Sequence, residues 1–245
     1  MVIKLQRYFV DSKDIQENNL KISGNDAHHI KDVMRYKRLD QIIVNTYDGQ
    51  VFLAEITEIE KKDIIVTIIN ELKSDFRPLD LDLAVSMIRK DNFELVLQKT
   101  TELGVNKIIP LKTENSIIKI DDFGKKLLRY QSIVKEASEQ SERNLITEIV
   151  DLTEIERLDV SSYKYKFVCY AREASKSLNQ ELSGYKKGDK ALVLIGPEGG
   201  FSIREIELLK QRGFISVSLG KTILRAETAS VYVASVFRYL EENAI

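Results

Sequence analysis

A glycine-rich loop between an apolar run and a helix start constrains the fold of this chain more than any other feature. Residues 191–195 are all apolar, which is typical of a strand buried on both faces. The run ends in Gly-Pro-Glu-Gly-Gly at 196–200, where glycines allow positive φ angles and close approach of the backbone to a ligand. Ser202 and Glu205 follow with capping-box spacing, so a helix is expected to begin at about Ser202.

The same order of elements then occurs a second time. The helix is expected to end at Gly213, residues 214–219 predict another buried strand, and Gly220 opens a polar loop that leads into a helix from about Ser230. This is α/β topology, in which ligands bind beyond the carboxyl ends of the strands, so both loops are candidate walls of one pocket. The loop at 196–200 is neither G-x-G-x-x-G nor a P-loop with its GK[ST] ending, which argues against an ordinary dinucleotide or triphosphate site.

The two loops resemble the C-terminal signature of the SPOUT RNA methyltransferases. The matching stretches are LVLIGPEGGFS at 192–202 and LGKTILRAETA at 219–229, and they are most similar to the family that methylates N3 of a uridine in bacterial 16S ribosomal RNA. The resemblance implies an α/β domain with a deep trefoil knot that binds S-adenosylmethionine. The candidate cofactor-binding residues are Leu194, Ile195, Gly196, Gly199, Gly200, Leu219, Gly220, Ile223, Leu224 and Thr228.

Methyl transfer from a sulfonium mainly requires positioning, because the donor carries its own leaving group. Uracil N3 bears a proton at neutral pH, which must be removed or its developing charge stabilised. Arg225 is the candidate cation, for a phosphate or the carbonyl oxygens of the base. Glu198 or Glu227 is the candidate proton acceptor, directly or through water, and the sequence alone does not choose between them; both carboxylates could equally be helix caps or ion-pair partners.

Residues 1–73 have a different pattern and predict a small β-barrel with one helix at about 25–35. The pair Asp48-Gly49 is a hairpin signal. Strands are expected at 7–10, 42–46, 50–56 and 64–69. RYFV at 7–10 and HHIKDVMRYKR at 28–38 resemble the PUA-like domain of the same methyltransferases, which grips RNA; Leu39-Asp40 stands where that family usually has Gly-Asp.

The polar run 73–78, closed by Pro78, predicts a domain boundary that separates residues 1–73 from a methyltransferase domain at 74–245. Strands and helices alternate after it, which is typical of α/β domains with a largely parallel sheet. The expected strands are 81–87, 107–111 and 166–171, and the expected helices are 92–103 and 123–143.

The family resemblance extends over nearly the whole chain, including IRKDNFELVLQKTTELGV at 88–105 and EQSER at 139–143. It implies contacts to RNA at Arg7, His29, Arg35, Lys90, Lys99 and Arg143. Asn115 replaces the arginine of the family's usual T-E-R-S segment, which removes one expected contact. On charge alone, the basic cluster at 28–38 is equally a solvated helix face, and the net charge of −1 provides no overall attraction to nucleic acid.

Composition indicates a cytoplasmic protein without a membrane span or signal peptide, because no apolar run is long enough. The single cysteine, Cys169, excludes an internal disulfide and lies in an apolar run, where an inert buried thiol is expected. No metal site is expected, since neighbouring His28 and His29 point about 100° apart on a helix and the chain has no other histidine.

The expected partners are 16S ribosomal RNA or the small ribosomal subunit, and a second copy of the chain. A homodimer is predicted because Val233, Val236, Phe237 and Leu240 form an apolar helix face. The alternatives are a catalytically inert RNA-binding module of the same fold, a methyltransferase for another RNA position, and a Rossmann-like enzyme that uses a nucleotide cofactor.

Overall fold

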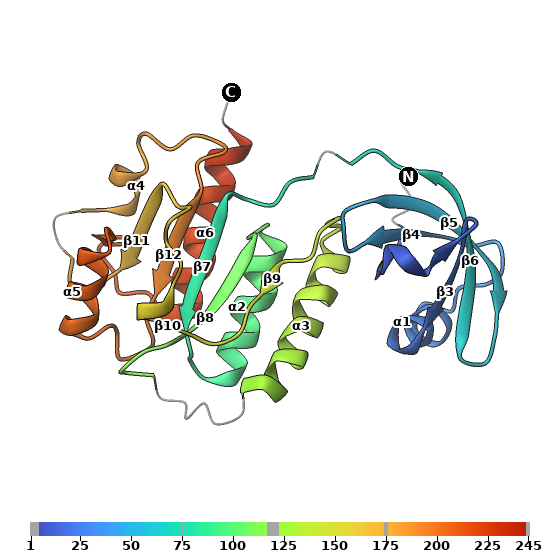
Figure 1. The fold of residues 1–245 in the computed structure, drawn as a ribbon, viewed down its shortest axis with the longest axis horizontal. Coiled ribbons are helices and arrows are strands. Elements are labelled where there is room, and N and C mark those ends of the chain that lie inside the picture. The colour runs from blue at the N-terminus through green and yellow to red at the C-terminus, as the bar shows by residue number, and fades with distance from the viewer. Residues whose placement is uncertain (1–4, 75, 117–122, 174–175, 244–245) are drawn as a thin grey trace. The chain divides into compact units, whose positions relative to one another are not determined.

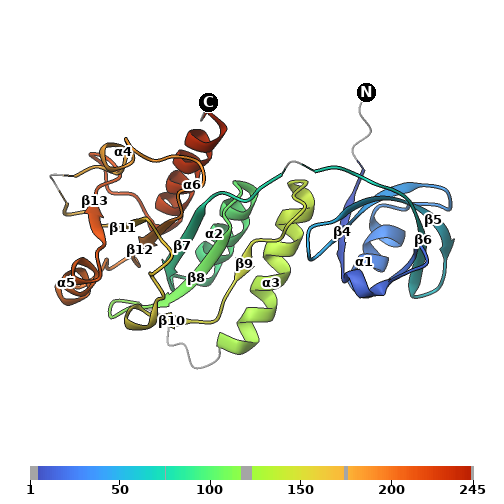
Figure 2. The same cartoon turned by 45° about the horizontal axis from the view of Figure 1, so that its top comes forward.

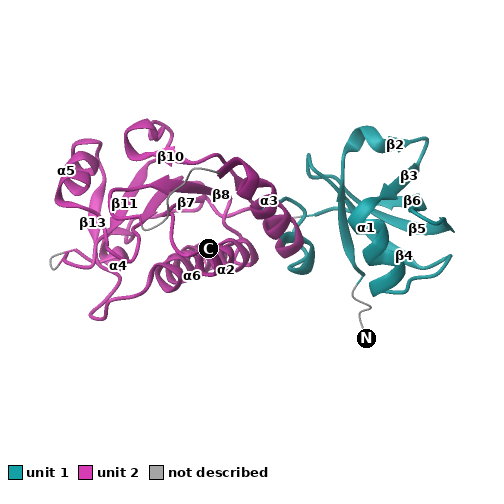
Figure 3. Cartoon of the chain, turned by 90° about the horizontal axis from the view of Figure 1, so that it is seen from below, with its two compact units in different colours: residues 1–77, 138–146 teal, residues 78–137, 147–245 magenta. Residues whose placement is uncertain are grey.

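The computed structural model describes residues 5–74, 76–116, 123–173 and 176–243. The chain forms two compact units, shown in Figure 3: Met1–Arg77 with Ser138–Ile146, and Pro78–Ala137 with Thr147–Ile245. The predicted division into 1–73 and 74–245 did not place residues 138–146 with the N-terminal part. Asn45 Nδ2 donates to the Arg143 carbonyl oxygen at 2.9 Å, and the Phe9 amide donates to Glu139 Oε1 at 3.3 Å. These long-range bonds hold the segment in unit 1.

Unit 1 is a mixed six-stranded sheet with a short helix (Figures 1 and 2). Its order is β1 (Arg7–Val10), β4 (Gln41–Thr46), β5 (Val51–Ile59), β6 (Asp63–Glu71), β3 (Asn19–Ser23) and β2 (Ile15–Gln16). Only the β1–β4 pair is parallel among the pairs described. The remaining elements are a 3-10 turn at Ser12–Asp14, α1 (Gly24–His28) and its continuation as a π-helical turn, η2 (His29–Val33). All four strands predicted in this region are present.

Three hairpins shape this sheet, β2–β3, β4–β5 and β5–β6, and a turn signal in the sequence indicated the second of them. Asp48-Gly49 turns β4 into β5 as predicted, with Gly49 at φ 97°. The β2–β3 hairpin was not predicted. Its two turn residues, Glu17 and Asn18, have φ of 47° and 70°, the positive values that a two-residue turn needs. A glutamate rarely adopts this conformation, so the local sequence did not indicate a turn.

A helix was predicted to run to Arg35, but the helical segment ends at Val33. Arg35 has a φ of 55° and lies in the turn beyond Val33. Leu39 has a φ of 76° and is 66% exposed, at the position where the resembling family usually has glycine. This conformation costs a residue with a Cβ atom roughly 1–2 kcal/mol. The hydrogen bond from the Leu39 amide to the Ile56 carbonyl, at 2.8 Å, holds the turn against β5.

Unit 2 contains a seven-stranded sheet in which every described pair is parallel, as the alternating pattern predicted. The order is β10 (Thr153–Glu154), β8 (Lys107–Lys112), β7 (Leu81–Ser86), β12 (Ala191–Ile195), β11 (Tyr165–Cys169) and β13 (Ile215–Val217), and β9 (Glu148–Ile149) also pairs with β8. The helical segments are α2 (Lys90–Glu102), α3 (Phe123–Gln140), η3 (Ile155–Arg157), α4 (Leu178–Glu181), α5 (Ile203–Gln211) and α6 (Ala226–Glu242). The predicted trefoil knot stays a prediction.

Helices cover both faces of this sheet, which explains why β12 is entirely apolar. Leu192 and Leu194 pack in one core cluster with residues of α5 and with η3, while α6 contacts β7 and β12 and packs beside α2 (Figure 1). All five residues of β12 are buried. Burying one such leucine side chain contributes roughly 1.5–3 kcal/mol, so β12 anchors the loops at both of its ends.

Helix α6 begins at Ala226 rather than at the predicted Ser230. Arg225 is therefore its N-cap residue, and Glu227 lies in its first turn, where the helix dipole favours a carboxylate. Ser230 is not a cap, because its hydroxyl donates to the Ala226 carbonyl at 2.8 Å within the helix.

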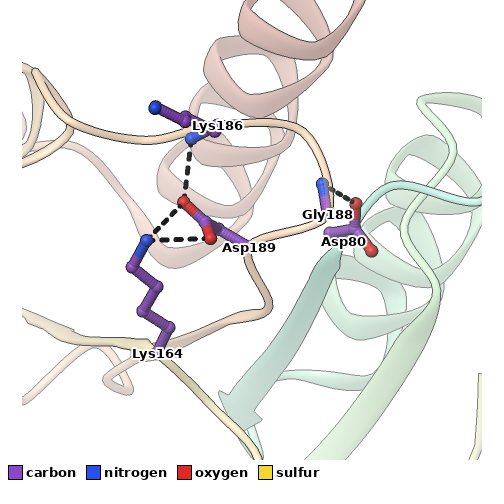
Figure 4. Close-up of polar contacts among 5 residues, drawn as sticks. All are labelled: Asp80, Lys164, Lys186, Gly188 and Asp189. Carbon is purple, nitrogen blue, oxygen red and sulfur yellow. Dashed lines mark hydrogen bonds and ion pairs between the residues drawn. The ribbon is translucent and has the colours of Figure 1, made fainter.

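The amino ends of three central strands are joined by the polar contacts in Figure 4. Asp80, just before β7, accepts a hydrogen bond from the Gly188 amide at 2.7 Å. Asp189, just before β12, accepts from Lys164 Nζ at 2.9 Å and from the Lys186 amide at 3.0 Å. The Lys164 ammonium group lowers the pKa of the Asp189 carboxyl group. These bonds fix one edge of the sheet, so the loops at the other edge extend from strands that are held in place.

Candidate active site

A cavity of about 810 Å³ lies at the carboxyl edge of the parallel sheet in unit 2. Its volume is in the range of pockets that hold a cofactor-sized molecule. Residues that follow five neighbouring strands line it: Arg89 and Asn92 after β7, Asn115 after β8, Tyr170 to Arg172 after β11, Gly196 to Ile203 after β12, and Ser218 to Arg225 after β13. Parallel pairing brings these strand ends to one edge, as predicted for the two glycine loops.

The loop after β12 needs its glycines for conformation and for packing. Gly200 has a φ of 69°, and its amide donates to the Pro197 carbonyl at 2.8 Å. A Cβ atom on Gly196 would lie 3.1 Å from the Phe201 ring, and one on Gly199 would lie 3.1 Å from Asn115 Cβ. Any larger side chain at these positions would displace the loop, so the loop presents its backbone to the cavity.

The loop after β13 contributes apolar and charged side chains to the same cavity. Leu219, Gly220, Ile223 and Leu224 line it, together with Ile195 from β12. The Ile223 side chain is 82% exposed, which is unusual for a large apolar residue beside a cavity. The cavity therefore has an apolar surface that a bound ligand can cover.

Two of the residues predicted to bind the cofactor do not line the cavity. Leu194 is fully buried and packs in the core with residues of α5, because successive side chains of a strand point to opposite faces. Thr228 is exposed in the first turn of α6 and is not among the lining residues. Its position follows from the early start of that helix, which places Glu227 rather than Thr228 at the cavity.

The three residues considered for catalysis all line the cavity: Arg225, Glu198 and Glu227. Within the described parts of the chain, none of the three forms a hydrogen bond or ion pair through its side chain. Arg225 caps α6 only through its backbone and does not pair with Glu227. The structure thus does not support ion-pair roles for the two carboxylates. All three side chains are available to a ligand.

Sequence reasoning missed further cations that line the cavity, namely Arg89, Arg172 and Lys221. With Arg225 they place four cationic side chains against the two carboxylates. The predicted RNA contact next to Arg89, Lys90, does not line the cavity and lies 3.8 Å from Glu94. The position of Arg89 directly beyond the end of β7 was the signal that could have identified it.

The remaining predicted RNA contacts are in different surroundings. Arg35 is exposed, Arg7 is half-buried with Glu142 at 3.9 Å, and His29 Nδ1 lies 3.0 Å from the Tyr8 hydroxyl. Lys99 pairs with Glu102 at 2.9 Å and does not line the cavity.

Arg143 requires a correction, because it is only 1% exposed and is not a surface contact for RNA. Its guanidinium group lies over the Phe76 ring, 5.3 Å from the centroid, and its carbonyl accepts the Asn45 bond described above. The arginine therefore helps to hold residues 138–146 in unit 1. Its burial depends on residues far away in the sequence, so the local pattern could not indicate it.

No group of three or more histidine, cysteine, aspartate or glutamate side chains in residues 5–74, 76–116, 123–173 and 176–243 is arranged to hold a metal ion. Among the helices described, none has both the length and the apolar character of a membrane span.

Comparison with known proteins defines the class of the chain. Residues 76–238 match the RNA methyltransferase domain, and residues 22–69 match the RNA methyltransferase PUA domain. An RNA methyltransferase is thus the class to which the α/β unit, its cavity and the mixed β unit correspond. The chain belongs to the RNA methyltransferase family with an N-terminal PUA domain, as the resemblance of its glycine loops indicated.

Several relatives match over the full length. Ribosomal RNA small subunit methyltransferase E of Bacillus subtilis (strain 168) is 34% identical over 251 residues, which covers 97% of this chain and 98% of the relative. A solved methyltransferase of Legionella pneumophila in complex with the bound cofactor SAM is 30% identical, with a TM-score of 0.88 and coverage of 97% and 98%. Ribosomal RNA small subunit methyltransferase E of Neisseria gonorrhoeae, solved with S-adenosyl methionine, is 27% identical, with a TM-score of 0.86 and the same coverage.

Cys169 lines the cavity at the end of β11, and burial raises the pKa of its thiol to about 12. A raised thiol pKa disfavours the nucleophilic thiolate, so alkylation by iodoacetamide at pH 8 should be at least about a hundredfold slower than for free cysteine. The rate should keep rising with pH above 9, where that of free cysteine levels off. The urea-unfolded chain, in which Cys169 is exposed, is the control. A plateau near pH 8.5 in the folded chain would contradict the raised pKa of this half-buried thiol.

Proposed function

We propose that this protein is an S-adenosylmethionine-dependent methyltransferase that modifies N3 of a uridine in the 16S RNA of the small ribosomal subunit, in the cytoplasm. The observation that carries the proposal is the cavity formed by the two glycine loops at the carboxyl edge of the sheet. Full-length relatives that carry the name ribosomal RNA small subunit methyltransferase E support the substrate. Membership of a methyltransferase family favours this enzyme over an inert RNA-binding module.

The residues of the cavity suit S-adenosylmethionine. Its charged methionine group and its adenine need polar backbone groups, which Gly196, Gly199, Gly200 and Gly220 can offer because they have no side chain of their own. Its apolar parts can lie against Ile195, Leu219, Ile223 and Leu224, while Leu194 and Thr228 would act from outside the cavity. When bound, S-adenosylmethionine supplies a methyl group on a sulfonium, which is an intrinsically good leaving group. The main task of the protein is then alignment.

The charged side chains of the cavity fit the needs of uracil N3. As the base loses its N3 proton, negative charge spreads onto the two flanking carbonyl oxygens. The guanidinium group of Arg225, which has no side-chain partner among the residues that the structure describes, stabilises this charge more in the transition state than in the ground state. Glu198 or Glu227 can accept the proton, directly or through water, and both reach the cavity. The excess of cations also suits the phosphates of an RNA substrate.

The replacement Arg225→Ala should leave the Kd for S-adenosylmethionine within about threefold but reduce the methylation rate constant by about a hundredfold or more, because one stabilising group is lost. Single-turnover methylation of small-subunit RNA, with RNA and cofactor at saturating concentrations, measures the rate constant. Arg157→Ala is the matched control, since Arg157 is an exposed cation outside the cavity. An unchanged rate constant for Arg225→Ala would exclude the catalytic role. Glu198→Gln and Glu227→Gln in the same assay assign the proton acceptor.

We also propose that unit 1 supplies RNA affinity through Arg35, Arg7 and His29. Lys90 and Lys99 of unit 2 contribute further contacts to RNA. The exposed guanidinium of Arg35 makes it the sharpest test. Arg35→Ala should weaken RNA binding and reduce the dependence of log K on log salt by about one. The Kd for S-adenosylmethionine should not change. If RNA binding and its salt dependence match those of the wild type, this basic segment is only solvated surface.

We further propose a homodimer that pairs through α6. Val233 and Phe237 are buried inside unit 2, so of the predicted apolar face only the half-buried Val236 and Leu240 remain, next to the 68% exposed Tyr239. Light scattering at micromolar concentration should give twice the mass of one chain, and Leu240→Lys should reduce that mass to one chain by placing a charge in the interface. A wild-type mass of one chain, with activity retained, would show that α6 packs only on its own sheet.

A further inference from the structure

A turn after β8 reaches across the sheet to the glycine loop after β12. In the sheet order β7 lies between these two strands, so their ends are roughly 10 Å apart. The turn comprises residues 113–116 and is closed by the Ser116 amide, which donates to the Thr113 carbonyl at 3.1 Å. Their two hydroxyl groups lie 2.7 Å apart. The turn is therefore a defined structure at the carboxyl edge.

Asn115, at the tip of this turn, binds the glycine loop directly. Its Nδ2 donates to the carbonyl oxygens of Gly200 at 3.0 Å and of Gly199 at 3.4 Å. Only the amino end of an asparagine amide can donate to two carbonyl groups, which fixes the orientation of this side chain. The close packing of Gly199 against Asn115 keeps the turn and the loop in contact.

Glu205 makes the second link between the turn and the loop. Its Oε2 accepts from the Ser202 amide at 2.8 Å in the capping box of α5, as the sequence predicted. Its Oε1 accepts from the Glu114 amide at 2.9 Å, and the side chain is buried, with the residue 6% exposed. The Glu205 carboxylate thus links Glu114, which precedes Asn115, to Ser202, which lies two positions after the glycine loop.

These links matter because the glycine loop has little to hold itself in place. Gly199 and Gly200 lack side chains and have the widest conformational freedom of any residue. Since peptide units are planar, fixing two successive carbonyl oxygens also fixes the N–H groups on the opposite sides of those units. A loop ordered in advance loses less entropy when a ligand binds than a loop that becomes ordered on binding.

We propose that Asn115 and Glu205 form a latch that holds the glycine loop in its ligand-binding conformation, and that both are positioning residues for the methyl donor. The inference rests on the proposed function, since the loop is a wall of the proposed S-adenosylmethionine site. The latch acts through the loop rather than on the reacting atoms. Its loss should therefore raise the Kd and the KM for the donor and leave kcat nearly unchanged.

Two substitutions at Asn115 test the latch in the full-length chain. Asn115→Asp keeps the shape but places a carboxylate oxygen against the two carbonyl groups, and Asn115→Ala removes the donor. Titration calorimetry with S-adenosylmethionine should show a Kd raised by roughly tenfold for Asn115→Asp and somewhat less for Asn115→Ala, with a less favourable binding entropy. Asn179→Asp is the control with the same charge change, on an exposed residue of α4 outside the cavity.

The kinetic readout separates positioning from general stability. For both Asn115 variants, kcat at saturating donor and RNA should stay within about threefold of the wild type. Asn115→Arg, which restores N–H donors, should recover most of the donor affinity. A lower melting temperature with an unchanged Kd would overturn the proposal, as would wild-type values of Kd for both variants.

Two further outcomes have a different meaning. If the wild-type chain does not bind S-adenosylmethionine, the proposed function fails rather than the latch. If Asn115→Asp does not fold, Asn115→Ala and Glu205→Gln decide. Glutamine offers one acceptor oxygen where Glu205 uses two, so Glu205→Gln should also raise the Kd, and an unchanged Kd in both folded variants would overturn the proposal.

Discussion

Parallel pairing of β12 with β7 and β11 is the constraint on which the rest of unit 2 depends. Ala191 pairs with Leu81 on one side and Tyr165 on the other, and Ile195 pairs with Val85 and Cys169. Because the strands run in the same direction with matched ends, every following loop emerges at one edge. Helices on both faces bury β12, so its position is not adjustable. The cavity is a consequence of this register.

The electrostatic character of the site is local. The whole chain has a net charge of −1, which gave no reason to expect attraction to RNA. The cavity instead gathers Arg89, Arg172, Lys221 and Arg225 from loops that are far apart in the sequence. Several acidic residues elsewhere are paired, such as Asp189 with Lys164 and Glu154 with Lys112. The net charge of the chain includes many ion pairs that cancel locally. It therefore does not report the charge of a single concave surface such as this cavity.

The predictions that succeeded rest on bonds between near neighbours. The Ser202–Glu205 capping box, the helix end at Gly213 and the Asp48-Gly49 hairpin each depend on contacts within about four residues. The errors concern helix boundaries, side-chain orientation and long-range burial. Leu194 was placed on the wrong side of its strand, and Arg143 was taken for a surface residue.

The sequence by itself determined the glycine loops and most of the strands and helices around them, and it indicated the family. Those features follow from backbone preferences and short-range hydrogen bonds that a local pattern records. Only the tertiary structure decided which side chains reach the cavity, that residues 138–146 belong to unit 1, and that Asn115 hydrogen-bonds to the glycine loop. Asn115 and Gly200 are 85 positions apart, and their contact exists only because β8 and β12 are placed in one sheet with β7 between them. A contact of that kind is set by the packing of whole elements, which no local stretch of sequence encodes.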